Sequence, residues 1–283
     1  MRLCTVRLPA GGTAAARYDG DDLVLLQYDD VGALLASGKD WMEWAARAEG
    51  NRLPLAGASL APVVPHPNKI ICLGLNYASH IAEMGRPTPQ YPTLFAKYDG
   101  SLIGANDAIL APAVSDQLDW EAELGVVVGQ SARHVVPADA LDHVAGYTVV
   151  NDITVRDWQH RTREFLAGKT FESTTPVGPA LVTPDELPAG ASGLDISCQV
   201  DGVVMQRSTT ADLLFSVAQI IAYVSTIITL LPGDVIATGT PGGVGAGRDP
   251  QIFLAPGQEV VTRIEGIGEL RNTVTADLAT PPR

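Results

Sequence analysis

Alternating hydrophobic and polar positions near the start of the chain predict β-strands over residues 3–8 and 22–27. A helical pattern follows over 31–48. Beyond it lies a stretch with little charge in which four prolines fall within fourteen residues: Pro54, Pro62, Pro65 and Pro67. Because proline fixes φ and lacks an amide proton, this stretch suits an extended connector better than a helix. We therefore predict a small N-terminal α+β domain over residues 1–65.

The rest of the chain, residues 66–283, has the pattern of one larger segment that is rich in strands. Residues 69–75 predict a buried strand and residues 77–84 a short helix, which a proline-rich loop follows. From residue 118 onward, glycine and proline separate short strands that we expect at 121–128, 146–152, 180–182, 195–200 and 234–238. This order lacks the regular alternation of strands and helices of a doubly wound sheet. It predicts an α+β, β-rich fold.

One long stretch without charged residues, 213–231, approaches the length of a membrane span. Its apolar residues, however, recur every three to four positions while polar residues take another face, which is typical of a packed helix. Asp212 is the expected N-cap, and Pro232 and Gly233 are expected to end the helix. This helix is long for the interior of a single domain, so we expect the protein to form a homo-oligomer and not to associate with a membrane.

Composition and charge narrow the class of protein. Of 283 residues, 46% are hydrophobic and 18% charged, which gives enough apolar surface for folding. The net charge of −13, without any run of lysine and arginine, excludes a nucleic-acid partner. Three distant cysteines indicate neither a disulfide framework nor a metal cluster, and the first residues lack the apolar run expected of a signal peptide, so we expect none. We therefore expect buried free thiols and a cytoplasmic protein.

The strongest local signal for chemistry is a pair of acids, Glu121 and Glu123, in an otherwise hydrophobic stretch. In a strand these side chains project from the same face, about 7 Å apart along the backbone. Two like charges repel, and a cation between them relieves the repulsion; oxygen ligands favour Mg²⁺, Mn²⁺ or Ca²⁺ over zinc. The alternative is a solvated strand edge that prevents pairing with other strands.

A third acid, Asp152, follows another predicted strand, and we expect the chain to turn helical after it. In such a helix Asp152, Arg156 and Gln159 lie along one face at i, i+4 and i+7. A carboxylate, a guanidinium and an amide then face one cavity, and Arg156 suits bidentate binding of a substrate carboxylate. Its alternative role is a surface ion pair with Asp152 or Glu164.

Two further groups of residues are candidates for proton transfer and charge stabilisation. His80 and Glu83 lie three positions apart on the predicted helix 77–84, where the carboxylate can orient the imidazole as a general base for water. An ordinary surface pair is the alternative. Lys169 is an isolated cation beside an apolar stretch and can neutralise an enolate or a carboxylate, whereas a solvated loop lysine is its alternative.

Taken together, these segments resemble the fumarylacetoacetate hydrolase family. The resemblance runs from about residue 69 to the C-terminus and rests on five motifs in the family's order. They are GLNYASHIAE (74–83), LDWEAELGVVVG (118–129), GYTVVNDITVRDWQ (146–159), GKTF (168–171) and LPGDVIATGTPGGVG (231–245). Residues 1–65 carry no motif of the family.

The resemblance implies a fold and a cofactor. The fold is the family's mixed β-roll and β-sandwich catalytic domain over residues 66–283, in a protein that forms dimers. The cofactor is a Mg²⁺ or Mn²⁺ ion, with Ca²⁺ as a non-native occupant. Its three carboxylate ligands match Glu121, Glu123 and Asp152.

The resemblance also implies roles for residues of the cavity. Lys169 and Gln159 match positions that contact the substrate and its enolate, and Arg156 belongs to the same wall. Thr240 matches a residue near the substrate carboxylate. These residues would therefore bind a small anionic 2-oxo acid.

The expected reaction follows from the same resemblance. His80 and Glu83 match the water-activating pair that the smaller, acylpyruvase-like members carry on a lid. The chain is then a hydrolase that cleaves a C–C bond in an acylpyruvate-type 2,4-dioxo acid, such as fumarylpyruvate or acetylpyruvate, through a metal-bound enolate in aromatic catabolism. An oxaloacetate decarboxylase or a 2-hydroxyhepta-2,4-diene-1,7-dioate isomerase uses the same parts. A non-catalytic fold relic or an interaction module is a further alternative.

Overall fold

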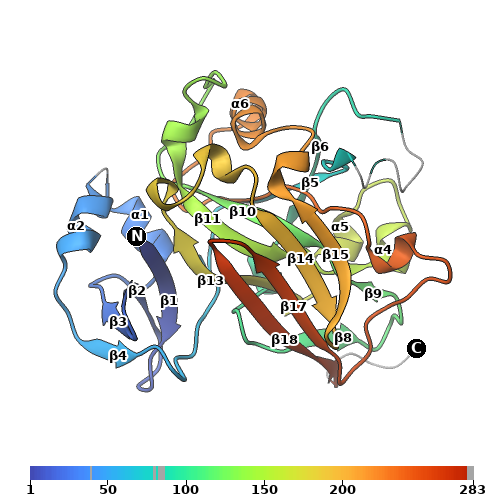
Figure 1. Cartoon of the computed structure of the whole chain (residues 1–283), viewed down its shortest axis with the longest axis horizontal. Helices are drawn as coiled ribbons and strands as arrows, with labels where there is room; N and C mark the ends of the chain where they lie inside the picture. The colour runs from blue at the N-terminus through green and yellow to red at the C-terminus, as the bar shows by residue number, and fades with distance from the viewer. Residues whose placement is uncertain (39, 79–80, 82–86, 279–283) are drawn as a thin grey trace.

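The computed structural model describes residues 1–278 apart from residues 39, 79–80 and 82–86. The N-terminal strands form an antiparallel meander, drawn in blue at the left of Figure 1: β1 (Arg2–Arg7), β2 (Thr13–Asp19), β3 (Asp22–Leu25) and β4 (Arg52–Pro54). Two short helices lie beside them, α1 (Val31–Ala36) and α2 (Trp41–Arg47). The prediction of one continuous helix over 31–48 is wrong, because Gly38, with a φ of 134°, lies between the two helices.

The N-terminal strands continue into the large sheet of the molecule, because β1 also pairs with β13 (Thr175–Val182). This eleven-stranded sheet continues through β11 (Val144–Asn151), β10 (Ala122–Val128), β16 (Val235–Ala237), β5 (Ile70–Gly74) and β6 (Thr93–Lys97), and β7 (Leu102–Ile103) pairs with β13. The N-terminal segment is therefore hydrogen-bonded to the larger one. The division into two domains near residue 65 stays a prediction.

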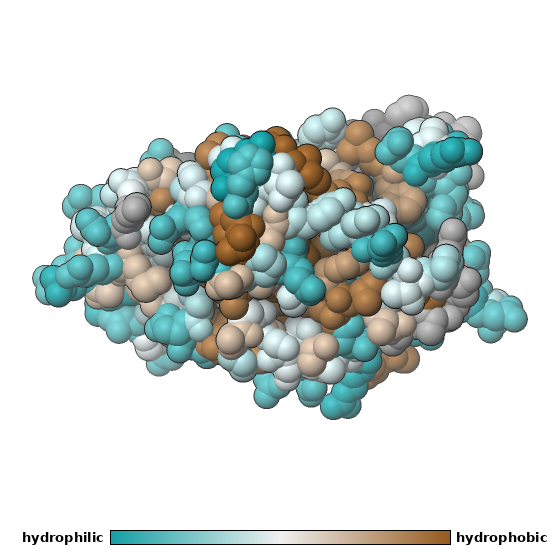
Figure 2. Space-filling model, turned by 90° about the horizontal axis from the view of Figure 1, so that it is seen from above, coloured by the Kyte–Doolittle hydropathy of each residue, from teal (hydrophilic) through white to brown (hydrophobic). Residues whose placement is uncertain are grey.

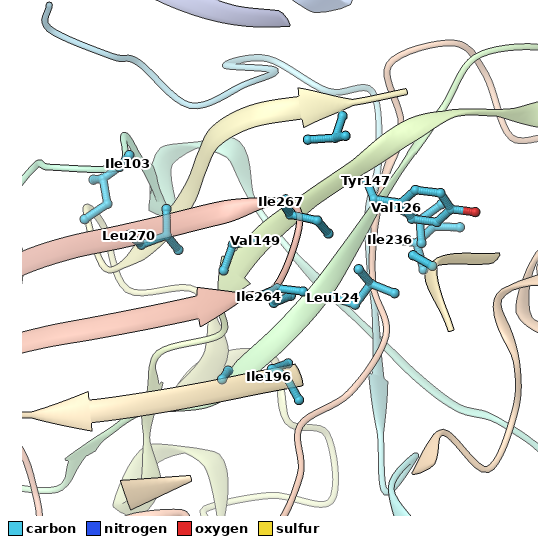
Figure 3. Packing of buried hydrophobic residues seen from close by; sticks show 14 of the residues in the cluster. Ile103, Leu124, Val126, Tyr147, Val149, Ile196, Ile236, Ile264, Ile267 and Leu270 are labelled. Atoms are coloured by element: carbon cyan, nitrogen blue, oxygen red, sulfur yellow. The ribbon is translucent and has the colours of Figure 1, made fainter. Parts of the chain in front are cut away.

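A five-stranded sheet packs against the large sheet (Figure 1). Its strand order is β15 (Val203–Thr209), β14 (Asp195–Val200), β17 (Glu259–Ile264), β18 (Gly268–Asp277) and β8 (Ile109–Pro112). Figure 3 shows Leu124 and Val149 of the large sheet close to Ile196 and Ile264 of the second sheet, and all four side chains are buried in one cluster. Two packed sheets with few helices confirm the predicted α+β, β-rich fold.

Short elements connect the sheets. A two-stranded ribbon of β9 (Leu118–Asp119) and β12 (Thr154–Val155) precedes two one-turn helices, α4 (Arg156–Gln159) and α5 (Leu166–Lys169). The 3₁₀ helices are η1 (Asp99–Ser101), η2 (Ala140–His143), η3 (Pro184–Glu186), η4 (Ala189–Ala191), η5 (Thr210–Asp212) and η6 (Gly245–Gly247). The ribbon and the two one-turn helices, at the right of Figure 1, carry several residues of the site described below.

The apolar stretch 213–231 contains one helix, α6 (Val217–Ile227), at the top of Figure 1. It is shorter than predicted because a capping box begins it at Ser216: the Gln219 N–H donates to the Ser216 hydroxyl, and the Ser216 N–H donates to the Gln219 side chain. Asp212 instead ends the 3₁₀ helix η5, so the prediction that it is the N-cap is wrong.

Apolar side chains remain exposed on the face that carries α6, which Figure 2 shows as brown patches among hydrophilic surface. Ile227, Ile228 and Leu231, at and beyond the end of this helix, are all exposed. The homodimer and the cytoplasmic location stay predictions. Among the residues that the structure describes, no helix combines the length and the apolar character that crossing a membrane requires.

Candidate active site

Three carboxylates meet where β10 begins and the neighbouring β11 ends. Glu121 directly precedes β10, Glu123 lies on it, and Asp152 directly follows β11. The antiparallel register pairs Ala122 with Asn151, and the Asp152 N–H donates to the Glu121 carbonyl at 2.9 Å. One ligand oxygen of each acid lies within 4.8 Å of the other two, and all three residues are buried. This burial excludes the alternative of a solvated strand edge.

Two buried lysines lie against these acids. Lys169, the last residue of α5, places Nζ 2.6 Å from Glu121 Oε2 and 2.7 Å from Asp152 Oδ2. Lys97, the last residue of β6, places Nζ 2.6 Å from Asp152 Oδ1 and 3.2 Å from the Ile153 carbonyl oxygen. Lys169 is 2% exposed and Lys97 is 3% exposed, so the alternative of a solvated loop lysine is wrong for Lys169.

A third cation, Arg156 at the start of α4, ties the acids to the wall of the site. Its Nε donates to Asp119 Oδ2 at 2.7 Å, and its Nη1 lies 2.7 Å from Glu121 Oε1. The same Nη1 donates to Gln159 Oε1 at 3.0 Å. Its Nη2 is buried without a hydrogen-bond partner among the described residues, which leaves one guanidinium nitrogen for a ligand.

The structure corrects two predictions about this arginine. Asp152 does not share a helix with Arg156 and Gln159, because α4 begins only at Arg156, after β12. The ion pair predicted with Asp152 or Glu164 does not form between these described residues. The guanidinium instead turns inward to the acids of β9 and of the segment before β10, because the ribbon of β9 and β12 holds α4 against them.

Glu123 is the acid whose surroundings fit a bound cation best. Its Oε2 accepts a hydrogen bond from the Gly239 N–H at 2.8 Å, whereas its Oε1 is buried without a partner among the described residues. Burial raises the pKa of Glu123 well above its usual range, and the charges of Asp152 and Glu121 raise it further. A buried, unpartnered carboxylate oxygen beside two other acids fits a hard divalent cation, which prefers oxygen ligands.

The cations of the site keep their charge. Burial lowers the pKa of Lys169, but Asp152 and Glu121 raise it by more, so that it lies above its usual value. The pKa of Arg156 is likewise lowered by burial and raised by more through Asp119 and Glu121. Near neutral pH both side chains therefore remain positively charged.

A cavity of about 430 Å³ opens beside the acids. Its apolar wall includes Leu73, Phe95, Phe165 and Val244. Its polar wall includes five of the residues predicted from the sequence, namely Glu121, Arg156, Gln159, Lys169 and Thr240. The Thr240 hydroxyl accepts a hydrogen bond from Gln206 Nε2 at 2.8 Å, which fixes it at the edge of the cavity. The structure thus brings the predicted acids, cations and amide to one place.

Sequence reasoning missed two charged residues of this site. Lys97 follows several prolines, which made its segment resemble a loop, although it ends strand β6. Asp119 lies two residues before Glu121 and accepts hydrogen bonds from Arg156 and from the Gly245 N–H, the latter at 2.7 Å. The spacing of two that revealed Glu121 and Glu123 extends back to Asp119 and was the available signal.

The predicted pair of His80 and Glu83 lies outside the described residues. Just before it, Asn76 is held on both sides of its amide: Nδ2 donates to the Thr238 carbonyl at 2.7 Å, and Oδ1 accepts from the Phe215 N–H at 2.8 Å. The chain that leads to the pair is therefore anchored to the end of β16 and to the start of α6.

Known proteins resemble this chain over most of its length. The sequence profile described as "Fumarylacetoacetate (FAA) hydrolase C-terminal" matches residues 69–275. The "Oxaloacetate tautomerase Fahd2a, mitochondrial" of Rattus norvegicus is 43% identical over 245 residues, which cover 85% of this chain and 78% of that protein.

Solved structures share the fold. The fumarylacetoacetate hydrolase of Exiguobacterium antarcticum is 33% identical with a TM-score of 0.86, covering 98% of this chain and 100% of that one. The 5-carboxymethyl-2-hydroxymuconate delta-isomerase of Mycobacterium smegmatis is 33% identical with a TM-score of 0.80, covering 98% and 99%. Proteins with different named reactions thus share this architecture.

Proposed function

The chain belongs to the fumarylacetoacetate hydrolase family, and we propose on that premise that it catalyses keto–enol tautomerisation of a small 2-oxo acid of the oxaloacetate type. This reaction moves one proton between C3 and the 2-oxo oxygen and consumes no water. Its barrier is set by the enolate, whose negative charge develops on the 2-oxo oxygen. The observation that carries the proposal is Lys169, a buried and charged ammonium group that lines the cavity beside the acids.

The relatives favour this reaction over the one predicted from the sequence. The tautomerase of Rattus norvegicus and the isomerase of Mycobacterium smegmatis both carry names of isomerising enzymes. Hydrolysis of an acylpyruvate stays the second candidate, because a protein named fumarylacetoacetate hydrolase also covers nearly the whole chain. Decarboxylation of oxaloacetate passes through an enolate as well, so the same cavity would suit it.

In this proposal two residues bind the substrate carboxylate at C1. Arg156 offers its Nη2, which is buried without a partner among the described residues. Gln159 lines the same wall, and because its Oε1 accepts from Arg156, the group it offers to a ligand is the Nε2 donor. A guanidinium and an amide donor side by side suit a planar carboxylate.

The acids and Lys169 act at the neighbouring 2-oxo group. Glu121, Glu123 and Asp152 offer oxygen ligands only, so the proposed ion is Mg²⁺ or Mn²⁺. When bound, such an ion polarises the carbonyl as a Lewis acid. Lys169 adds a fixed positive charge for the developing oxyanion.

Apolar side chains limit the access of water to Lys169 and so strengthen the interaction of its charge with the oxyanion. Phe95 and Phe165 line the cavity with their ring centroids 5.7 Å apart, and Lys169 Nζ lies 4.9 Å from the centroid of Phe95. In surroundings of low dielectric, a fixed charge interacts more strongly with an oxyanion than it would in water. The predicted pair of His80 and Glu83 stays the candidate for activating water in the alternative reaction, hydrolysis.

The test compares the candidate reactions on purified protein. Enol oxaloacetate is mixed with protein and Mg²⁺ or Mn²⁺, and formation of the keto form is followed by reduction with excess malate dehydrogenase and NADH. We expect metal-dependent acceleration that EDTA abolishes. Lys169→Met should lower kcat by about 10² to 10³, as loss of an oxyanion partner does. Arg161→Gln, an exposed arginine outside the cavity lining, is the matched control and should retain wild-type kcat.

The outcome that contradicts the proposal is equally concrete. If acylpyruvate is cleaved with a higher kcat/KM than that of oxaloacetate tautomerisation, the hydrolase prediction holds and the tautomerase proposal is wrong. His80→Ala separates the two further, because only hydrolysis requires an activated water. If His80→Ala no longer cleaves acylpyruvate but still tautomerises oxaloacetate, the two reactions depend on different residues.

A further inference from the structure

The segment between α4 and α5 lines the outer, solvent-facing part of the cavity, because most of its lining residues are exposed. His160, Thr162, Arg163 and Phe165 contribute to this lining. Among these four residues, Arg163 is the one with a permanent positive charge, because a guanidinium stays protonated at every working pH. It is exposed, and it makes no hydrogen bond or ion pair among the residues that the structure describes.

The neighbouring arginine is engaged elsewhere, and the contrast is informative. The guanidinium carbon of Arg161 lies 3.5 Å from the centroid of the Trp158 ring, in a cation–π contact. Arg161 does not line the cavity. Of two exposed guanidinium groups two residues apart, one is held on an aromatic ring, and the other borders the cavity without a partner in the described part of the chain.

The cavity is therefore lined by two buried cationic groups and by an exposed one. Arg156 and Lys169 lie at the inner end, where ion pairs with Asp119, Glu121 and Asp152 hold them. Arg163 lies in the segment that lines the outer part, without a carboxylate partner among the described residues. A ligand with one carboxylate is satisfied at the inner end alone, whereas a second carboxylate would need a counter-ion further out.

We propose that Arg163 binds the second carboxylate of the substrate and thereby selects 2-oxo dicarboxylic acids over 2-oxo monocarboxylic acids. This inference rests on the proposed function, because it takes the inner end of the cavity as the place of the 2-oxo acid group. A volume of about 430 Å³ lies at the lower end of the usual range for small-molecule sites and suits a single short diacid.

The geometry also sets the size of the effect. Arg163 is exposed, so water and salt screen its charge, and an ion pair there is weaker than one at the buried inner end. A bidentate contact between guanidinium and carboxylate partly offsets this screening. The residue is therefore expected to affect affinity and selectivity, while the chemical step depends on the inner residues.

The experiment compares Arg163→Gln with Arg161→Gln as the matched control, and Arg163→Lys as the conservative variant. Calorimetry on the Mg²⁺-loaded protein measures binding of 2-oxoglutarate, a diacid, and of 2-oxobutyrate, a monoacid. We expect Arg163→Gln to lower the ratio of diacid to monoacid affinity about fivefold, the effect of one exposed but well-oriented ion pair. Arg163→Lys should recover part of the ratio, and Arg161→Gln should leave it unchanged.

Other outcomes overturn the inference or separate it from the proposed function. An unchanged ratio in Arg163→Gln, or the same loss in Arg161→Gln, would show that Arg163 does not read the second carboxylate. A wild-type protein that binds both acids equally would do so as well. If the ratio falls as expected while oxaloacetate is not tautomerised, the proposed function fails and the binding role of Arg163 stands.

Discussion

The two faces of strand β10 are equally buried and serve opposite purposes. On one face Leu124 and Val126 enter the apolar cluster between the two sheets. On the other, Glu123 continues the row that begins with Glu121, and the Glu121 carboxylate forms ion pairs with Arg156 and Lys169. Burial of the apolar face stabilises the folded state whatever the detailed arrangement of its side chains. Burial of the charged face stabilises it only if the charges have their partners in place. A fold does not need such a face, which is why it points to function.

The charge balance of the second face shows what it is suited to hold. Its described side chains are four carboxylates, Asp119, Glu121, Glu123 and Asp152, and three cations, Lys97, Arg156 and Lys169. The carboxylates exceed the cations by one, so the net charge of this group is negative, and a bound divalent ion would make it positive. A site that becomes positive on binding its ion attracts an anionic substrate, although the whole chain carries a net charge of −13.

The largest effect should come from breaking the charged face without changing its shape. Lys97→Met removes a buried cation that is bonded to Asp152 and to the Ile153 carbonyl. We expect a loss of about 3–5 kcal/mol in the free energy of unfolding, because a buried carboxylate loses one of its counter-ions. Urea denaturation of the metal-free protein measures it.

A double-mutant cycle controls for lost packing at this lysine. Adding Asp152→Asn to Lys97→Met removes the unbalanced charge and should recover most of the stability. If the double variant is as unstable as the sum of the two single variants, the two side chains are not coupled. The lysine would then stabilise the fold through its aliphatic stem alone.

A smaller loss is expected from the apolar face of the same strand. Leu124→Ala leaves a cavity between the sheets and should cost about 3 kcal/mol, within the range for leucine in a packed core. Among the described residues, Leu124 touches no charged group of the site, so this variant should leave the affinity for Mg²⁺ unchanged, whereas Lys97→Met should alter it. A changed affinity would show that the two faces are mechanically linked through β10.

The two faces also differ in how far the sequence predicts them. The apolar face follows from alternation, since the valines after Glu123 predict a strand whatever the rest of the chain does. The acids Glu121 and Glu123 stand out for the same reason. Lys97 was missed because its role depends on the pairing of β5 with β6, a contact between segments that local pattern cannot reveal.

The corrections have a similar origin. Asp152 and Arg156 were placed on one helix by their spacing of four, whereas the pairing of β12 with β9 keeps the chain extended between them. Local spacing could not show this, because the partner strand lies more than thirty residues earlier in the chain. The acid and the arginine still reach the same cavity, so the predicted constellation survives an incorrect local geometry.

The next prediction concerns the sign of a stability change. Because the pKa of Glu123 is raised above 4.5 in the folded state, the folded chain holds this proton more tightly than the unfolded chain. The resulting stabilisation is fully present below pH 4.5 and is lost as the pH rises through the raised pKa. Glu123→Gln has no such loss, so above pH 4.5 and without metal it should be more stable than wild type.

Metal should reverse that order. Wild-type protein in Mg²⁺ or Mn²⁺ at a hundred times the dissociation constant should gain about 2.7 kcal/mol, whereas Glu123→Gln should gain much less. Thermal denaturation with and without the ion measures both. Asp195→Asn, which removes an exposed acid from the other sheet, is the control and should gain as much as wild type. An equal gain in Glu123→Gln would mean that this carboxylate is not a ligand.

The smallest effect concerns which of the two buried regions opens first. Cys198 lies in the apolar cluster, where burial raises its pKa to about 12, and burial and then Asp152 raise the pKa of Cys72 beside the charged face. Both should resist iodoacetamide at pH 8 and react at one common rate, that of global unfolding, since each thiolate forms only when its strand is exposed. Mass spectrometry of each cysteine against time measures the two rates. If Cys72 reacts faster and Mg²⁺ slows it to the rate of Cys198, the charged face opens locally without its ion, and the two faces of β10 belong to different cooperative units.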